Sequence, residues 1–217
     1  MELDLIYKQR FNEVEGRKKL WQILVKDFFQ AYVGPNDVVL DLPCGYSEFI
    51  NNVKCKRKLA VDLNPDSKRY TGRDVEFFEA SSTHLPIKDE TVDIVFISNF
   101  FEHLGHEDIL ATIKECHRVL RPQGRVMVLQ PNVRFAYKDY WMFLDHITPI
   151  DDRMLNEAFS LQRFKSVRKI VRFLPFTAKS RLPQARWLVK LYLKLPLAWF
   201  LMGKQSFLVY AKSEKGA

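Results

Sequence analysis

Two aspartates each end an apolar run, and their chemistry and spacing predict a site for a nucleoside. Asp41 ends the run 38–41, and Asp62 ends the run 59–62. Between them lies a short loop that contains Gly45, and we expect a helix to start at Ser47. Such a loop presents backbone N–H groups and the positive end of a helix dipole to a ligand. A carboxylate at the tip of the next strand accepts hydrogen bonds from the ribose hydroxyls, so the pattern predicts a nucleoside-containing cofactor.

The loop departs from the usual glycine-rich form at two positions. Pro43 and Ser47 stand where such loops usually carry glycine. Proline has no N–H and a fixed φ, and serine adds a Cβ where a left-handed conformation is needed. These residues leave a second interpretation open, in which the chain binds a partner and catalyses nothing.

Two acid–histidine pairs are candidates for a general base. Glu102–His103 closely follows the apolar run 92–98, and Asp145–His146 lies in an aromatic-rich segment. An adjacent carboxylate sets the tautomer of a histidine and raises its basicity. The alternative is a structural role, in which His103 is a hydrogen-bonding residue and Asp145–His146 anchors a loop. The histidines show no recognisable metal-ligand spacing, so no metal site is predicted.

Apolar runs that alternate with helical patterns must position these residues. The runs predict strands at 38–42, 59–62, 75–79, 92–98, 125–130, 166–173 and 205–212. The helical spacings predict helices within 11–32, from residue 47, near 65–70, and over 106–120 and 152–161. Strands separated by helices indicate βαβ units and a mostly parallel sheet in an α/β fold.

A single domain is expected from the 217 residues. We divide it into an N-terminal helical cap (1–35), a cofactor-binding core (36–130) and acceptor-side insertions with C-terminal strands (131–217). Its three cysteines have no Cys-x-x-Cys spacing, which argues against a disulfide framework. The first residues lack the basic and apolar regions of a signal peptide, so a cytoplasmic location is expected.

The positive charge is concentrated in the second part of the chain. Residues 131–217 hold 16 Lys and Arg against 6 Asp and Glu, and no acid lies between Glu157 and Glu214. Within this part, 187–202 is largely apolar and interrupted by Pro196, and a narrow basic stripe of Arg186, Lys190 and Lys194 runs along it. It is too short and too charged to span a bilayer. Residues 163–202 therefore either close the core or make peripheral contact with an anionic inner membrane.

The order of the motifs over residues 36–130 resembles that of the class I S-adenosylmethionine-dependent methyltransferases. Within this group the chain is similar to a type 11-like bacterial branch often encoded with polysaccharide-biosynthesis genes. The stretches that recur there are Ser98–Leu104, Leu129–Asn132, Tyr140–Trp141, Asp145–His146 and Lys179–Gln184. The resemblance implies a Rossmann-like, seven-stranded, mostly parallel sheet whose last strand is antiparallel, with a helical insertion before that strand.

The resemblance also implies which residues bind S-adenosyl-L-methionine and its product, S-adenosyl-L-homocysteine. Asp41, with the Pro43–Gly45 turn, is expected to anchor the methionine end, and Asn99 to line it. Asp62 is expected to bind the ribose, and Leu63 to pack on the adenine. The hydroxyl of Ser81 and the N–H of Ser82 are expected to read the adenine edge.

The expected reaction is methyl transfer to a hydroxyl of a sugar in a glycan or glycolipid precursor. His146 or His103 would be the base, with Asp145 beside it. The expected substrate-binding residues are Tyr140, Trp141, Lys179 and Arg181. A quinone or lipid acceptor is the alternative. Nucleic acid is not expected, because the chain carries no amino-methylating motif and no RNA-binding module.

Overall fold

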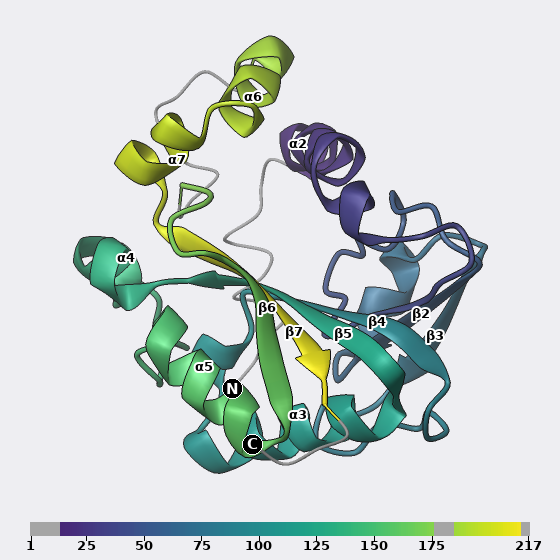
Figure 1. Cartoon of the computed structure of the whole chain (residues 1–217). Helices are drawn as coiled ribbons and strands as arrows, with labels where there is room; N and C mark the ends of the chain where they lie inside the picture. Colours follow the sequence, from purple (N-terminus) through teal and green to yellow (C-terminus); the bar gives the residue numbers. More distant parts are fainter. Residues whose placement is uncertain (1–13, 176–184, 214–217) are drawn as a thin grey trace.

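The computed structural model describes residues 14–175 and 185–213. A seven-stranded sheet runs through the molecule in the order β3–β2–β1–β4–β5–β7–β6 (Figure 1). Strand β7 is antiparallel to both of its neighbours, and the other pairs are parallel. The predicted fold class is therefore confirmed. The strands are β1 (Val38–Asp41), β2 (Arg57–Asp62), β3 (Val75–Glu79), β4 (Val92–Ser98), β5 (Leu120–Pro131), β6 (Phe164–Ile170) and β7 (Gln205–Lys212).

Helices cover both faces of the sheet, so β1 is buried along its whole length. Beneath the sheet in Figure 1 lie α3 (His106–Val119) and α5 (Asp152–Leu161), with α2 (Val14–Asp27) and the 3₁₀ turn η1 (Phe29–Tyr32) on the opposite side. Each face has its own apolar core, packed around residues such as Ile113 and Phe159 on one side and Phe29 and Phe96 on the other. Burial on both faces explains why the central strands are apolar without alternation.

Local capping chemistry sets where several helices begin. The side chain of Asn132 accepts a hydrogen bond from the Arg134 N–H at the start of α4 (Val133–Tyr140). Asp151 caps α5 in the same way, accepting from the N–H groups of Arg153 and Met154. These caps satisfy backbone donors that have no partner inside the helix.

The predicted insertion before the last strand is present as two short helices, α6 (Arg186–Leu193) and α7 (Pro196–Met202), with Pro196 at the first helical turn. Leu193 is buried in the same core as Phe29, and Trp199 packs against that core. The indole N–H of Trp199 also donates to the Tyr192 carbonyl, which ties α7 to α6.

Two predicted helices on the cofactor side take other forms. Residues 48–52 form turns where a helix was expected from Ser47. Ser47 has a φ of 57°, and the segment makes only isolated bonds of helical type, from the Asn51 N–H to the Ser47 carbonyl and from the Val53 N–H to the Phe49 carbonyl. The helix expected near 65–70 is the 3₁₀ helix η2 (Pro65–Tyr70). The positive end of a regular helix dipole is therefore missing from the loop after β1.

Phe29 is the aromatic centre of the core under α2, and its removal tests how this core is held. Its ring is fully buried and lies within 6.1 Å, centroid to centroid, of the rings of Trp21, Phe96 and Phe207. We expect Phe29→Ala to lower the free energy of unfolding by about 3–5 kcal/mol, because it leaves a cavity in a packed interior. Denaturant unfolding measures this. Leu161→Ala, at a side chain that is 66% exposed, should change stability by less than about 0.5 kcal/mol.

Candidate functional site

The carboxyl ends of three parallel strands meet at one edge of the sheet. β1 lies between β2 and β4, so that Asp41 is level with Ala60 on one side and Phe96 on the other. The chain order reverses between β1 and β4, and ligands of open α/β sheets bind outside the strand ends at such a switch point. The loops after β1, β2 and β4 therefore surround the candidate site.

Asp62 holds the loop after β1 in place. One of its carboxylate oxygens accepts a hydrogen bond from the Gly45 N–H at 2.8 Å, and the other accepts from the Asn64 N–H at 2.9 Å. Gly45 has a φ of 48°, a left-handed conformation that glycine adopts without steric cost. Ser47 adopts a similar φ of 57° despite its Cβ, as the sequence suggested for this position. The two predicted anchors, Asp62 and Gly45, thus act as one unit.

Asp41 is a buried carboxylate at the base of this loop. It is 3% exposed, and it accepts a hydrogen bond of 3.3 Å from the Ile50 N–H. Burial raises its pKa well above the ordinary value, and the nearby negative charges of Glu48 and Asp62 raise it further. Burial also raises the pKa of Asp62, against the lowering effect of its backbone hydrogen bonds. A cationic or hydroxyl-bearing ligand would compensate for this cost.

An ion pair that the sequence analysis missed fastens α2 to the same loop. Arg17 contacts both carboxylate oxygens of Glu48, at 2.6 and 2.9 Å. Its guanidinium also lies over the Tyr46 ring, 5.3 Å from the centroid. Glu48 is buried, so this pair is shielded from solvent and stabilises the loop from outside the sheet. Sequence spacing gives no signal for a contact between residues so far apart.

The residues expected on the adenine side lie in two different environments. Leu63 is 64% exposed directly after Asp62, as a residue that packs on a base requires. The Ser81 hydroxyl pairs with the Thr83 hydroxyl at 2.9 Å, whereas the buried Ser82 hydroxyl pairs with Thr112 of α3. Only the backbone of Ser82 therefore remains for the adenine role predicted for it.

Asn99 follows β4 in a left-handed conformation, with a φ of 48°. Its side-chain oxygen accepts a hydrogen bond from the amide of Gln205, the first residue of β7. Its side-chain nitrogen donates to the hydroxyl of Ser98. These contacts fix Asn99 at the strand ends, where lining the methionine part of the cofactor stays a prediction.

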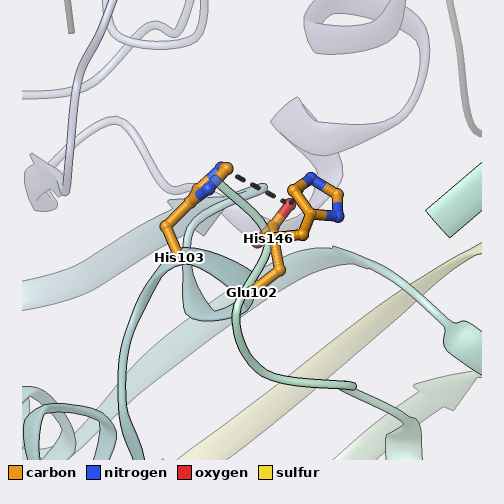
Figure 2. Close-up of side chains that lie close together, drawn as sticks. All are labelled: Glu102, His103 and His146. Atoms are coloured by element: carbon orange, nitrogen blue, oxygen red, sulfur yellow. Dashed lines mark ion pairs between the residues drawn. The ribbon is translucent and has the colours of Figure 1, made fainter. Parts of the chain in front are cut away.

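The structure brings both predicted acid–histidine pairs together after β4. The Nδ1 atom of His103 lies 3.0 Å from the Asp145 carbonyl and 3.4 Å from its carboxylate. The rings of His103 and His146 are 5.1 Å apart. Figure 2 shows the carboxylate of Glu102 between the two imidazoles, with its oxygen 3.9 and 4.0 Å from their Nε2 atoms. The sequence places Glu102 next to His103, but it does not predict that the carboxylate lies between the two histidines.

Exposure separates the two candidate bases. The side chain of His103 is 23% exposed, whereas those of His146 and Glu102 are 4% and 2% exposed. Tyr140 and Phe143 enclose His146, each with its ring centroid 5.0 Å from the imidazole. Burial raises the pKa of Glu102 above the ordinary value for glutamate. Of the two imidazoles, that of His103 is thus the more open to an acceptor.

The expected substrate-binding residues differ in position. Tyr140 is fully buried, and its hydroxyl donates to the Thr148 carbonyl and accepts from the Ile150 N–H. These contacts favour a role in holding the loop that carries His146. Trp141 is 56% exposed and available for an acceptor. Lys179 and Arg181 lie outside the described residues.

Residues 40–128 match the family described as "Methyltransferase domain". Among curated proteins, a probable S-adenosylmethionine-dependent methyltransferase of Mycobacterium tuberculosis is 34% identical over 101 residues, which are 43% of this chain and 35% of the relative. A 2-phytyl-1,4-naphtoquinone methyltransferase of a Nostoc species is 24% identical over 199 residues, 78% of this chain and 84% of the relative. The chain spans less than half the length of the first curated relatives that it matches.

The fold also matches solved structures. A crystal structure of a SAM-dependent methyltransferase from Archaeoglobus fulgidus aligns with a TM-score of 0.68 and 17% identity, covering 98% of this chain and all of that one. Together with the sequence matches, this likeness supports S-adenosylmethionine as the cofactor. Residues 40–128 are thus similar to a methyltransferase domain, and the chain has the fold of the class I S-adenosylmethionine-dependent methyltransferases.

Proposed function

We propose that this chain transfers a methyl group from S-adenosylmethionine to a hydroxyl of a sugar in a glycan or glycolipid precursor. The observation that carries the proposal is the arrangement at the switch point. There, Asp62 organises the cofactor loop after β1, and the Glu102–His103–His146 cluster follows β4. A cofactor edge and a proton-accepting edge are thus adjacent in the sheet.

The cofactor edge suits the charges of S-adenosylmethionine. The buried carboxylate of Asp41 is placed to bind the positively charged amino group of the methionine part. The exposed Leu63 would cover one face of the adenine, and Asp62 would accept hydrogen bonds from the ribose hydroxyls. The two carboxylates would replace the hydrogen bonds that the amino group and the ribose hydroxyls make with water, and Leu63 would shield the adenine from water.

Methyl transfer from a sulfonium is an in-line displacement, so alignment supplies most of the catalysis. A new bond forms between the acceptor oxygen and the methyl carbon while the carbon–sulfur bond breaks. The hydroxyl proton must leave, and in this proposal the Nε2 atom of His103, the more exposed of the two histidines, would accept it. Because Nδ1 of His103 faces Asp145 at 3.0 and 3.4 Å, the imidazolium that forms would be stabilised.

A quinone acceptor is the second candidate, and the relatives favour it. The Nostoc relative is named for a naphthoquinone acceptor, and a relative from Blochmanniella pennsylvanica is a ubiquinone/menaquinone C-methyltransferase. The sugar acceptor is supported by the resemblance of the stretches 98–104 and 145–146 to the polysaccharide-associated branch. Both acceptors must lose a proton, so the histidine cluster serves either one.

The first test is calorimetric titration with S-adenosylhomocysteine. We expect Asp62→Ala to weaken binding by about 100-fold or more, because two hydrogen bonds to a charged group are lost. Asp66→Ala is the matched control, since Asp66 belongs to η2 and forms an ion pair with Arg69. A folded wild-type chain that does not bind the ligand would contradict the proposed function.

The pH dependence of the same titration reports on the two buried carboxylates. Their pKa values are raised by burial, so the ionised forms that bind the ligand are lost at a higher pH than the ordinary value of about 3.9. Affinity should be full above the raised pKa values and should fall as the pH falls through them. Asp62→Asn should bind more weakly at neutral pH and lose less affinity on acidification. Equal pH profiles for the two proteins would rule out Asp62 as a ligand group.

We also propose that α6 and α7 contact the anionic surface of the inner membrane from the cytoplasmic side. Their outer side chains are apolar and exposed, and they are Trp187, Leu191, Leu195, Leu197, Phe200 and Leu201. Arg186, Lys190 and Lys194 lie along the same segment. Among the described residues, no helix is long and apolar enough to cross a membrane. An amphipathic, basic surface of this kind suits contact within the lipid interface.

Sedimentation with lipid vesicles tests this contact. Wild type should pellet with vesicles of anionic phospholipid, and raising the salt to about 1 M should release much of it, because screening shortens the electrostatic range to about 3 Å. The double variant Leu197→Glu/Phe200→Glu should lower the bound fraction at least about tenfold, since two apolar side chains no longer enter the interface. Leu161→Glu on α5 is the control. Equal pelleting of the double variant and the control would contradict the proposed surface.

A further inference from the structure

Glu102, His103 and His146 form a cluster with the geometry of metal ligands. Each offers one ligand atom, and the three atoms lie within 4.8 Å of one another. The Glu102 oxygen lies 3.9 and 4.0 Å from the two Nε2 atoms, which is too long for a hydrogen bond. Three donors thus converge on a common space without bonding one another directly (Figure 2).

The contacts behind Glu102 and His103 turn a lone pair of each toward this space. Gln130 donates to the other oxygen of Glu102 at 2.6 Å, which leaves the first oxygen facing the histidines. The Nδ1 atom of His103 is 3.0 Å from the Asp145 carbonyl, so Nδ1 carries the proton and Nε2 is free to bind a cation. Hydrogen bonds of this kind fix the tautomer and orientation of histidine ligands in metal sites.

We propose that these three residues bind a divalent first-row transition metal ion. Two imidazoles and one carboxylate suit Zn²⁺, Co²⁺ or Mn²⁺, and such a set leaves coordination positions open. To bind one ion at about 2.1 Å, the three atoms must approach one another by roughly 1 Å, which side-chain rotations allow. His103, the most exposed of the three, marks the side from which an oxygen of a further ligand would reach the ion.

The metal site stands on this geometry, and only its role toward the acceptor rests on the proposed function. When the ion is bound, Nε2 of His103 is a ligand and no longer a proton acceptor. An acceptor hydroxyl whose oxygen bound the ion would lose its proton to solvent water more readily, because the cation would lower its pKa. That oxygen would then form its bond to the methyl carbon as the carbon–sulfur bond breaks.

The sequence does not predict this metal site, because its three residues do not have the short spacing of a metal-binding motif. His103 and Glu102 are adjacent, but His146 comes from the loop after α4 and reaches them only through the fold. The backbone carbonyl of Glu102 holds that loop in place, because it accepts hydrogen bonds from the N–H groups of Ile147 and Thr148. The third ligand is therefore held against the first two.

The test uses the full-length chain, freed of any affinity tag and treated with a chelator. Titration with Co²⁺ should give visible absorption bands that saturate at one equivalent, and Zn²⁺ should abolish them by competition. Glu102→Gln and His146→Ala should each weaken Co²⁺ binding by about 100-fold or more, beyond the 10–100-fold typical of losing a supporting contact. His106→Ala removes an exposed histidine outside the cluster and should bind Co²⁺ as wild type does.

Two further measurements keep the outcomes distinct. Saturating Zn²⁺ should raise the melting temperature of wild type and His106→Ala, but not that of Glu102→Gln, which keeps the shape of the native side chain. S-adenosylhomocysteine titration of each variant shows whether it is folded and whether the cofactor site is intact. If wild type binds S-adenosylhomocysteine but binds Co²⁺ no better than His146→Ala does, the metal site is overturned and the proposed function is not. A chain that binds Co²⁺ through the cluster but does not bind the ligand supports the metal site and contradicts the proposed function.

Discussion

Two carboxylates must be buried next to each other at the ends of β1 and β2, and the cofactor side of the molecule is arranged around that requirement. Asp62 is satisfied by the N–H groups of Gly45 and Asn64, and Asp41 by that of Ile50. These bonds draw the backbone of the loop inward and bend it through left-handed conformations. The Ile50 N–H lies in the first turn after Ser47, where a backbone donor has no carbonyl partner one turn back, so the carboxylate satisfies it as a helix cap would.

The sheet could be predicted from sequence because its strands are short apolar runs buried on both faces, and this pattern is local. The loop after β1 was predicted less well. Its glycine and acids were recognised, but the helix expected from Ser47 is a series of turns. Helical spacing describes which side chains face the core and does not reveal whether the backbone hydrogen bonds of the segment continue beyond one or two turns. Long-range partners such as Arg17 and Glu48 are equally invisible to local patterns.

The acceptor side depends on contacts that connect distant segments. The carbonyl of Glu102 accepts hydrogen bonds from two N–H groups of the loop after α4. The buried hydroxyl of Tyr140 makes two more hydrogen bonds with the same loop. Together they hold His146 against the end of β4. Tyr140 was predicted as a substrate contact because it lies among aromatic residues in the sequence. Its burial results from the way the loop after α4 packs against the end of β4, which the sequence does not show. Sequence reasoning recognised the residue types here and could not assign which of them face inward.

In the proposed function, the histidines do not distinguish a sugar acceptor from a quinone, but the charge of the acceptor does. A sugar hydroxyl and a quinol both lose a proton on methylation, and both a lipid-linked sugar and a quinone reside at a membrane. They differ in charge, because a lipid-linked sugar precursor is carried on phosphate and a quinone is not. The stretch from Glu157 to Glu214 contains no acid between its ends, and residues 131–217 hold 16 basic side chains. An acceptor that carries phosphate would be attracted by that charge directly, whereas a neutral one would gain only from contact of the basic surface with an anionic membrane. This direct attraction is the physical argument for the phosphate-linked sugar in the function that we propose.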